Sequence, residues 1–72
     1  MKASNIKFVY FIHPVQIRMK NSVKPLHVVS NDRFRLDMKP TYLQIEIDNM
    51  LTLVPLHNIS SIQIEGATEE GV

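Results

Sequence analysis

The segment from residue 33 to residue 64 alternates apolar and polar side chains almost without interruption, and it contains no glycine. The apolar positions recur at every second residue in two runs: Phe34, Leu36 and Met38, then Leu43, Ile45 and Ile47. A period of two is typical of strands that bury one face and leave the other in solvent. Because short turns separate the runs, the pattern predicts an all-β, mostly antiparallel architecture.

Proline and turn residues divide the chain into short strands. We expect strands at residues 6–12, 15–20, 23–29, 33–38, 43–47, 50–54 and 61–65, and a short turn, such as one turn of 3₁₀ helix, at residues 56–60. Proline has no N–H to donate, so His13-Pro14 should interrupt pairing and Pro25 should mark an edge strand. The predicted fold is a small antiparallel barrel or a strongly curled sheet of five to seven short strands. It forms a single domain over residues 1–65, and residues 66–72 form a flexible acidic tail.

Two predicted hairpins set the pairing in the middle of the chain. A loop over residues 39–42 would place Arg35 opposite Glu46 and Arg33 opposite Asp48. The Asp48-Asn49 dipeptide should close the next hairpin, because asparagine tolerates the left-handed backbone of tight turns.

The register of residues 50–54 stays open at this point. A two-residue loop points Met50, Thr52 and Val54 inward, and a three-residue loop points Leu51 and Leu53 inward. Since a slip of one residue exchanges the two faces, and both faces are apolar, this strand predicts burial on both sides.

Size makes self-association a natural expectation. The chain has 72 residues, no cysteine and 44% hydrophobic residues. A domain this small buries only about 60% of the surface that its unfolded chain exposes, and no disulfide can reinforce it. The strand at residues 6–12 is apolar on both faces, as is the one at 50–54. We therefore expect a homo-oligomer assembled through these two regions.

The net charge argues against bulk attraction to nucleic acid, and the lengths of the apolar runs argue against insertion into a membrane. The net charge is +1, from 8 basic and 7 acidic residues. The basic residues concentrate in residues 1–35 and the acidic ones in residues 36–72. No apolar run approaches the ~18 residues of a membrane span, and no signal peptide is indicated. We expect a soluble, cytoplasmic protein, for which RNA is a less favoured partner than a small ligand.

No motif predicts catalysis. The three histidines match no metal signature in their spacing, and only the fold or an oligomer axis would gather them: His13, His27 and His57. The serines lie in predicted turns without an orienting carboxylate nearby. No glycine precedes residue 66, so a phosphate-binding glycine loop is absent from the sequence. We expect a protein that is not an enzyme and that uses no metal or cofactor.

Binding of a phosphate-bearing ligand is a better-supported prediction. Four cations and two aromatic residues are the candidate ligand-binding residues: Arg18, Lys20, Arg33, Arg35, Tyr10 and Tyr42. Arginine can hold phosphate with two hydrogen bonds, and tyrosine can stack on a base. Arg33 and Arg35 are either paired with Asp48 and Glu46 or free for a ligand. Arg18 and Lys20 have no acidic neighbour in sequence, which makes them the first candidates.

The stretch YLQIEIDNMLTLVPLHNISSIQI at residues 42–64 resembles the C-terminal half of an Sm-like small β-barrel. In that family a hairpin runs into a short 3₁₀ turn and a final strand, with isoleucines placed as Ile59 and Ile62 are here. The resemblance implies ring assembly through edge strands and RNA binding. The chain departs from the family by its predicted N-terminal strand and by lacking a glycine in the bent strand, and no RNA-binding residue transfers to it.

A looser similarity is to small bacteriophage proteins that assemble as homo-oligomers and sequester nucleotide signals of host defence. It rests on size, the lack of a catalytic motif and the expected oligomer. The leading hypothesis is therefore a non-catalytic, homo-oligomeric protein that binds a phosphate-bearing small ligand, such as a signalling nucleotide. The alternatives are an Sm-like RNA-binding ring, and a protein–protein adaptor or structural module without a ligand.

Overall fold

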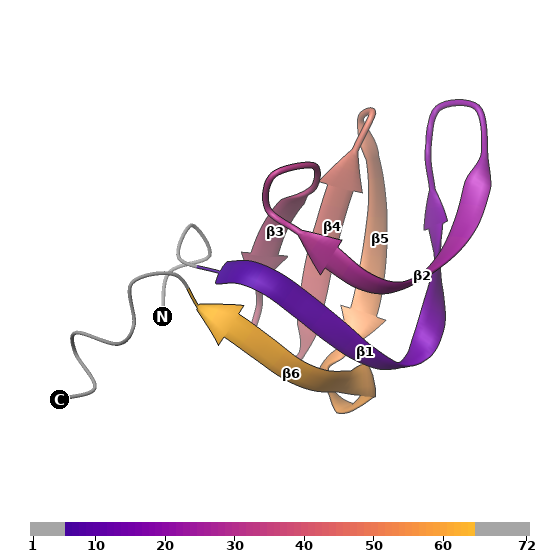
Figure 1. Ribbon diagram of the computed structural model, residues 1–72. Coiled ribbons are helices and arrows are strands. Elements are labelled where there is room, and N and C mark those ends of the chain that lie inside the picture. The colour runs from indigo at the N-terminus through magenta and orange to yellow at the C-terminus, as the bar shows by residue number, and fades with distance from the viewer. Residues whose placement is uncertain (1–5, 65–72) are drawn as a thin grey trace, which may run out of the picture.

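The computed structural model describes residues 6–64, which form six strands and one short 3₁₀ turn (Figure 1). The elements are β1 (Ile6–Arg18), β2 (Val23–Ser30), β3 (Arg35–Met38), β4 (Tyr42–Ile47), β5 (Met50–Pro55), η2 (Leu56–Asn58) and β6 (Ile59–Ile64). They make two antiparallel three-stranded sheets, in the orders β2-β1-β6 and β3-β4-β5. The all-β prediction and the expected 3₁₀ turn are confirmed. The expected acidic tail lies outside the described residues.

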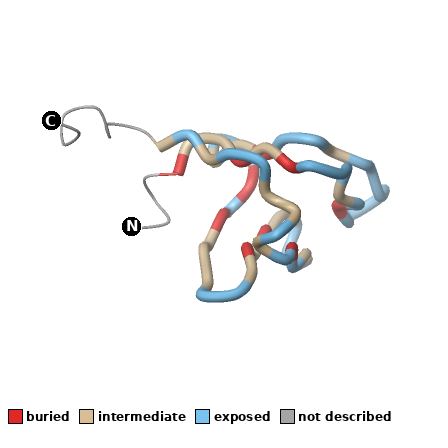
Figure 2. The backbone as a smooth tube through the Cα atoms, turned by 90° about the horizontal axis from the view of Figure 1, so that it is seen from below, coloured by how far each residue is buried: buried red, intermediate tan, exposed pale blue. Residues whose placement is uncertain are grey.

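The prediction of a closed barrel is not met. Within residues 6–64 no ladder joins the two sheets, which pack instead as two layers around a shared core. Buried positions, red in Figure 2, are single residues separated along the tube by intermediate and exposed ones, as expected for strands with one face inward. The six strands fall within the predicted number. No helix in this part of the chain is both long and apolar enough to span a membrane.

The β3–β4–β5 meander follows the alternating sequence closely. Leu36 lies opposite Ile45, and Leu43 lies opposite Val54; all four side chains are buried. The turn between β4 and β5 consists of Asp48 and Asn49 alone, with φ angles of 55° and 64°.

This two-residue turn settles the register of β5. Val54 is buried and Met50 and Thr52 share its face, whereas Leu51 and Leu53 expose 56% and 57% of their surface. The two-residue alternative is confirmed. The inference that both faces of this strand are buried is wrong for the single chain.

Strands β1 and β2 form a long hairpin whose ladder slips near its middle. Tyr10 pairs with Val28 and Val15 with Leu26, so the four residues 11–14 of β1 lie opposite His27 alone. The interruption predicted at His13-Pro14 is confirmed, but β1 continues through it as one strand.

The slip lets opposite sides of β2 contact the core. Val29 is buried and Leu26 packs against the core cluster, although residues three apart point to opposite faces of a regular strand. Across the slip, Ile12 lies outside the core with 54% of its surface exposed. Burial was expected on both faces of residues 6–12. In this segment only Ile6, Val9 and Phe11 are buried, whereas Phe8 and Tyr10 are half-buried.

The tips of two hairpins are joined at one end of the molecule. The Met19 N–H donates to the Ser22 carbonyl at 2.7 Å, which closes the β1–β2 turn. The next backbone N–H, that of Lys20, donates to Asp48 Oδ2 at 2.9 Å. The Asp48 carboxylate therefore holds the β1–β2 tip against the β4–β5 turn. No ion pair joins it to Arg33 within residues 6–64, so of the two alternatives for Arg33 the unpaired one is found.

Candidate functional site

A hollow of about 210 Å³ lies beside β2, between that strand and the turn that follows it. One cation and one hydroxyl line it among apolar side chains: Phe8, Leu26, Val28, Val29, Ser30, Arg33 and Phe34. Ligand sites commonly combine an apolar wall with a few polar groups that orient the ligand. This hollow is the candidate functional site.

The turn after β2 places Arg33 at the hollow. The backbone N–H groups of Arg33 and Phe34 both donate to the Ser30 carbonyl, at 3.4 and 3.0 Å, and the Asn31 N–H donates to the Lys7 carbonyl at 3.0 Å. These hydrogen bonds fold the chain back before β3 begins at Arg35. The strand expected over residues 33–38 therefore begins two residues later, and the expectation that places Arg33 on the same strand as Arg35 is wrong.

The guanidinium of Arg33 is held by apolar neighbours and leaves donors free. Its Cζ lies 5.6 Å from the centroid of the Phe34 ring, a cation–π distance, and its Nη2 lies 3.9 Å from Met19 Sδ. Within residues 6–64 the ion pairs are Lys7–Asp32 and Lys39–Asp37, and neither includes Arg33. A guanidinium has five N–H donors, and none of those of Arg33 contacts a carboxylate among these residues.

Two aromatic rings adjoin the hollow on β1. Phe8 lines it directly, and the Tyr10 ring lies 6.2 Å from the Phe8 ring with an interplanar angle of 42°. Both residues are half-buried and lie outside the core cluster, opposite Ser30 and Val28 respectively. A planar ligand group can stack on such rings. Tyr10 remains a candidate ligand-binding residue because its ring lies beside that of Phe8, which lines the hollow.

The other predicted residues are dispersed. Arg18 ends β1 opposite Val23, and Lys20 lies beyond the strand, so the strand expected over residues 15–20 ends two residues early and does not hold both cations. Lys20 follows Met19, which Arg33 contacts, and this places its backbone near the same end of the molecule.

Arg35 and Tyr42 belong to the other sheet. Arg35 lies opposite Glu46, as predicted from the hairpin, although no ion pair joins the two side chains in the described part of the chain. Tyr42 lies opposite Pro55 on β5. The structure therefore places Arg33 at the hollow and Tyr10 beside Phe8, which lines the hollow, whereas Arg35 and Tyr42 lie on the other sheet.

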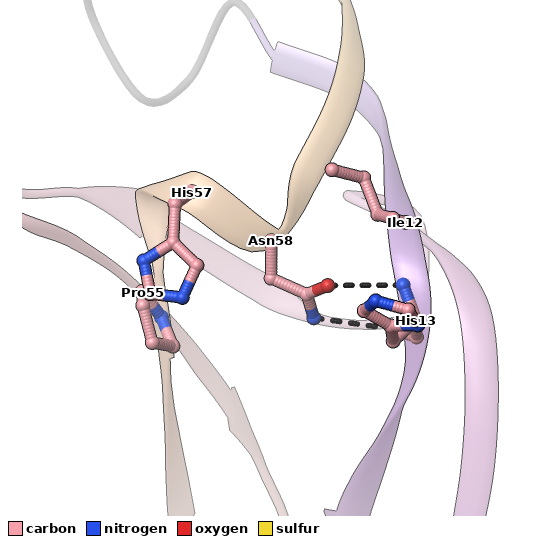
Figure 3. Close-up of a pocket in the computed structure, with 5 residues that line it drawn as sticks. All are labelled: Ile12, His13, Pro55, His57 and Asn58. Carbon is pink, nitrogen blue, oxygen red and sulfur yellow. Dashed lines mark hydrogen bonds between the residues drawn. The ribbon is translucent and has the colours of Figure 1, made fainter.

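A second hollow, of about 350 Å³, lies where β1 passes the 3₁₀ turn (Figure 3). It is lined by Ile12, His13, Pro55, His57 and Asn58. The Asn58 side chain accepts a hydrogen bond from the His13 N–H at 2.9 Å and donates one to the His13 carbonyl at 3.2 Å. Two of the three histidines thus line this hollow. No group of three metal-ligating side chains occurs within residues 6–64.

Phe8 and Ser30 line the hollow beside Arg33, called the Arg33 hollow from here on, but neither is among the candidate residues predicted from the sequence. A signal for Phe8 was present, because it stands two residues from Tyr10 on the same strand and so shares its face. Ser30 carried no comparable signal, since a serine in a turn usually bonds to the backbone.

No protein-family model, curated protein or solved structure matches this chain. The similarities to Sm-like barrels and to small phage proteins stay predictions.

Proposed function

We propose that the protein is a non-catalytic, homo-oligomeric binding protein for a phosphate-bearing small ligand, such as a signalling nucleotide that it sequesters. The observation that carries this proposal is the position of Arg33, a cation without a carboxylate partner in residues 6–64, at the edge of a hollow with an aromatic wall. Charge-assisted hydrogen bonds from a guanidinium to phosphate are strong and directional.

Each neighbour of Arg33 has a role in this proposal. The Phe34 ring and the Met19 sulfur fix the direction of the guanidinium without neutralising its charge. Phe8 and Tyr10 offer a surface for a planar base, and the Ser30 hydroxyl can accept or donate a hydrogen bond. At about 210 Å³ the hollow is smaller than the ~300 Å³ at which drug-sized sites begin, which favours a small ligand held partly at the surface.

The test is a thermal-shift panel of mono-, di- and cyclic nucleotides, followed by calorimetric titration of any that raises the melting temperature. A ligand at about 100 times its dissociation constant adds about 2.7 kcal/mol of stability. Arg33→Gln should weaken binding at least tenfold. Its matched control is Arg35→Gln, an exposed arginine on the other sheet, which should bind as the wild type does. Equal loss in both variants, or no binding by any nucleotide, contradicts the proposal; the latter leaves the adaptor hypothesis.

An Sm-like RNA-binding ring is the second candidate. The succession of the β4–β5 hairpin, η2 and β6 over residues 42–64 is the arrangement that the resemblance implies, and this supports it. Oligo-A and oligo-U in the same panel separate the two candidates. Binding of these oligomers by a ring-sized assembly, without binding of mononucleotides, would favour RNA.

A further inference from the structure

Strand β5 combines an open edge with an exposed pair of leucines. It is the last strand in the order β3-β4-β5, and Figure 1 shows it at the margin of that sheet. Leu51 and Leu53 share its outward face, and each exposes more than half of its surface. An edge strand with apolar side chains readily pairs with another strand.

The tight turn shows which backbone groups of β5 are free. Ile47 and Met50 flank the two-residue loop, so they form the first hydrogen-bonded pair, and bonded pairs then alternate with non-bonded ones. The N–H and C=O groups of Leu51 and Leu53 therefore point away from β4. Pro55 has no N–H, and its backbone also points away from β4, which is where prolines of edge strands are found. No hydrogen bond outside the ladders of residues 6–64 uses these groups.

We propose that β5 pairs antiparallel with β5 of a second copy of this chain, with Thr52 on the two-fold axis. This inference deepens the proposed function, because it assigns an interface to the oligomer included there. In this register Leu51 faces Leu53 of the other copy, and each pair exchanges two backbone hydrogen bonds. A shift by two residues toward Pro55 would place Leu51 opposite a residue without an N–H, and a shift the other way would leave only one bonded leucine pair. The proline therefore favours the centred register.

A second copy fits this edge in charge as well as in pattern. Glu46 lies opposite Leu51 on β4, so in this register the two Glu46 residues of the dimer would be separated by three strand spacings across the sheet and by two residues along it, about 16 Å in all. That exceeds the Debye length of about 8 Å at physiological salt, and their repulsion is largely screened. Two leucines per copy bury far less than the ~800 Å² per partner of a stable interface, so the dimer is weak and depends on concentration.

The experiment is sedimentation equilibrium of the full chain from about ten micromolar to one millimolar, the range expected for a weak contact. The wild type should pass from monomer to dimer. The double variant Leu51→Thr, Leu53→Thr should weaken association at least tenfold, while Val23→Thr, which changes an exposed valine on β2 outside the hollow, should not. Leu53→Pro keeps an apolar side chain but removes an outward N–H, and it should also weaken association. Circular dichroism confirms that each variant is folded.

Cross-linking then tests the register, because the chain contains no cysteine of its own. Thr52→Cys should form a covalent dimer under mild oxidation, and Leu51→Cys should not. Monomer at all concentrations, unchanged association of folded Leu51/Leu53 variants, or cross-linking by Leu51→Cys alone would each overturn the proposal. Ligand binding measured on the monomeric double variant separates this outcome from the proposed function, since the Arg33 hollow contains no β5 residue.

Discussion

The side chain of Asn58 offers a quantitative test of how the two halves of the fold are joined. Its amide makes two hydrogen bonds to the backbone of His13, at 2.9 and 3.2 Å, and so connects the 3₁₀ turn η2 to the irregular part of β1. A net contribution of about 0.5–1 kcal/mol per hydrogen bond is expected for such exposed groups. Asn58→Ala should therefore lower the free energy of unfolding by about 1–2 kcal/mol.

Urea denaturation followed by circular dichroism measures this loss. In a domain of this size 1 kcal/mol corresponds to roughly 4–8 °C in melting temperature. His13→Ala is the matched control, because His13 contributes only its backbone and the variant keeps both hydrogen bonds. Asn58→Asp keeps the acceptor and loses the donor, and should fall between wild type and Asn58→Ala. If His13→Ala destabilises the protein as much as Asn58→Ala, the histidine side chain and not the amide bridge stabilises this junction.

Two further predictions concern single residues. Asn49 has a φ of 64°, so Asn49→Ala should lower the free energy of unfolding by about 1 kcal/mol, because a Cβ without a polar group disfavours this conformation. Asn49→Gly should not lower it, and equal effects of the two substitutions in urea denaturation would contradict this reasoning. The pKa of Lys39 lies above its ordinary value of 10.5 because the ammonium hydrogen-bonds to the Asp37 carboxylate, with charge attraction between the two adding to it. Since the folded pKa is raised, the stabilisation is complete below pH 10.5 and fades as the pH rises through the folded value. Asp37→Asn should bring the Lys39 titration, followed by NMR, back toward 10.5, and an unchanged midpoint would exclude the contact.

The meander could be predicted because its determinants are local. Alternation predicts the faces of β3 and β4, whereas the register of β5 stayed open between a two-residue and a three-residue loop, and the two-residue Asp48-Asn49 turn decides it. The same alternation gave a wrong strand start at Arg33. The alternating pattern of apolar and polar residues includes Arg33, but the backbone there forms a turn. The N–H groups of Arg33 and Phe34 donate to the Ser30 carbonyl, and β3 begins at Arg35.

The site depends on contacts that are distant in sequence, and therefore only part of it could be predicted. Arg33 was selected for its charge, but its partners Met19 and Phe8 come from β1 and the turn after it. The positions of Met19 and Phe8 relative to Arg33 depend on the slip in the β1–β2 ladder. That slip is set by how the two strands pair and not by either strand alone. His13-Pro14 marked where pairing would break, but neither residue specifies how many residues the break would include.

That slip also explains how so small a chain can provide both a core and a hollow. In a β1–β2 hairpin with regular pairing, one face would be buried along the whole length and the other face would lie in solvent. With four residues of β1 opposite one of β2, Val29 contacts the core on one side of the ribbon, and Leu26 contacts it on the other while also lining the Arg33 hollow. The hollow is thus a consequence of the irregular ladder and not of a larger core, whereas the regular meander leaves Leu51 and Leu53 exposed on its outward face.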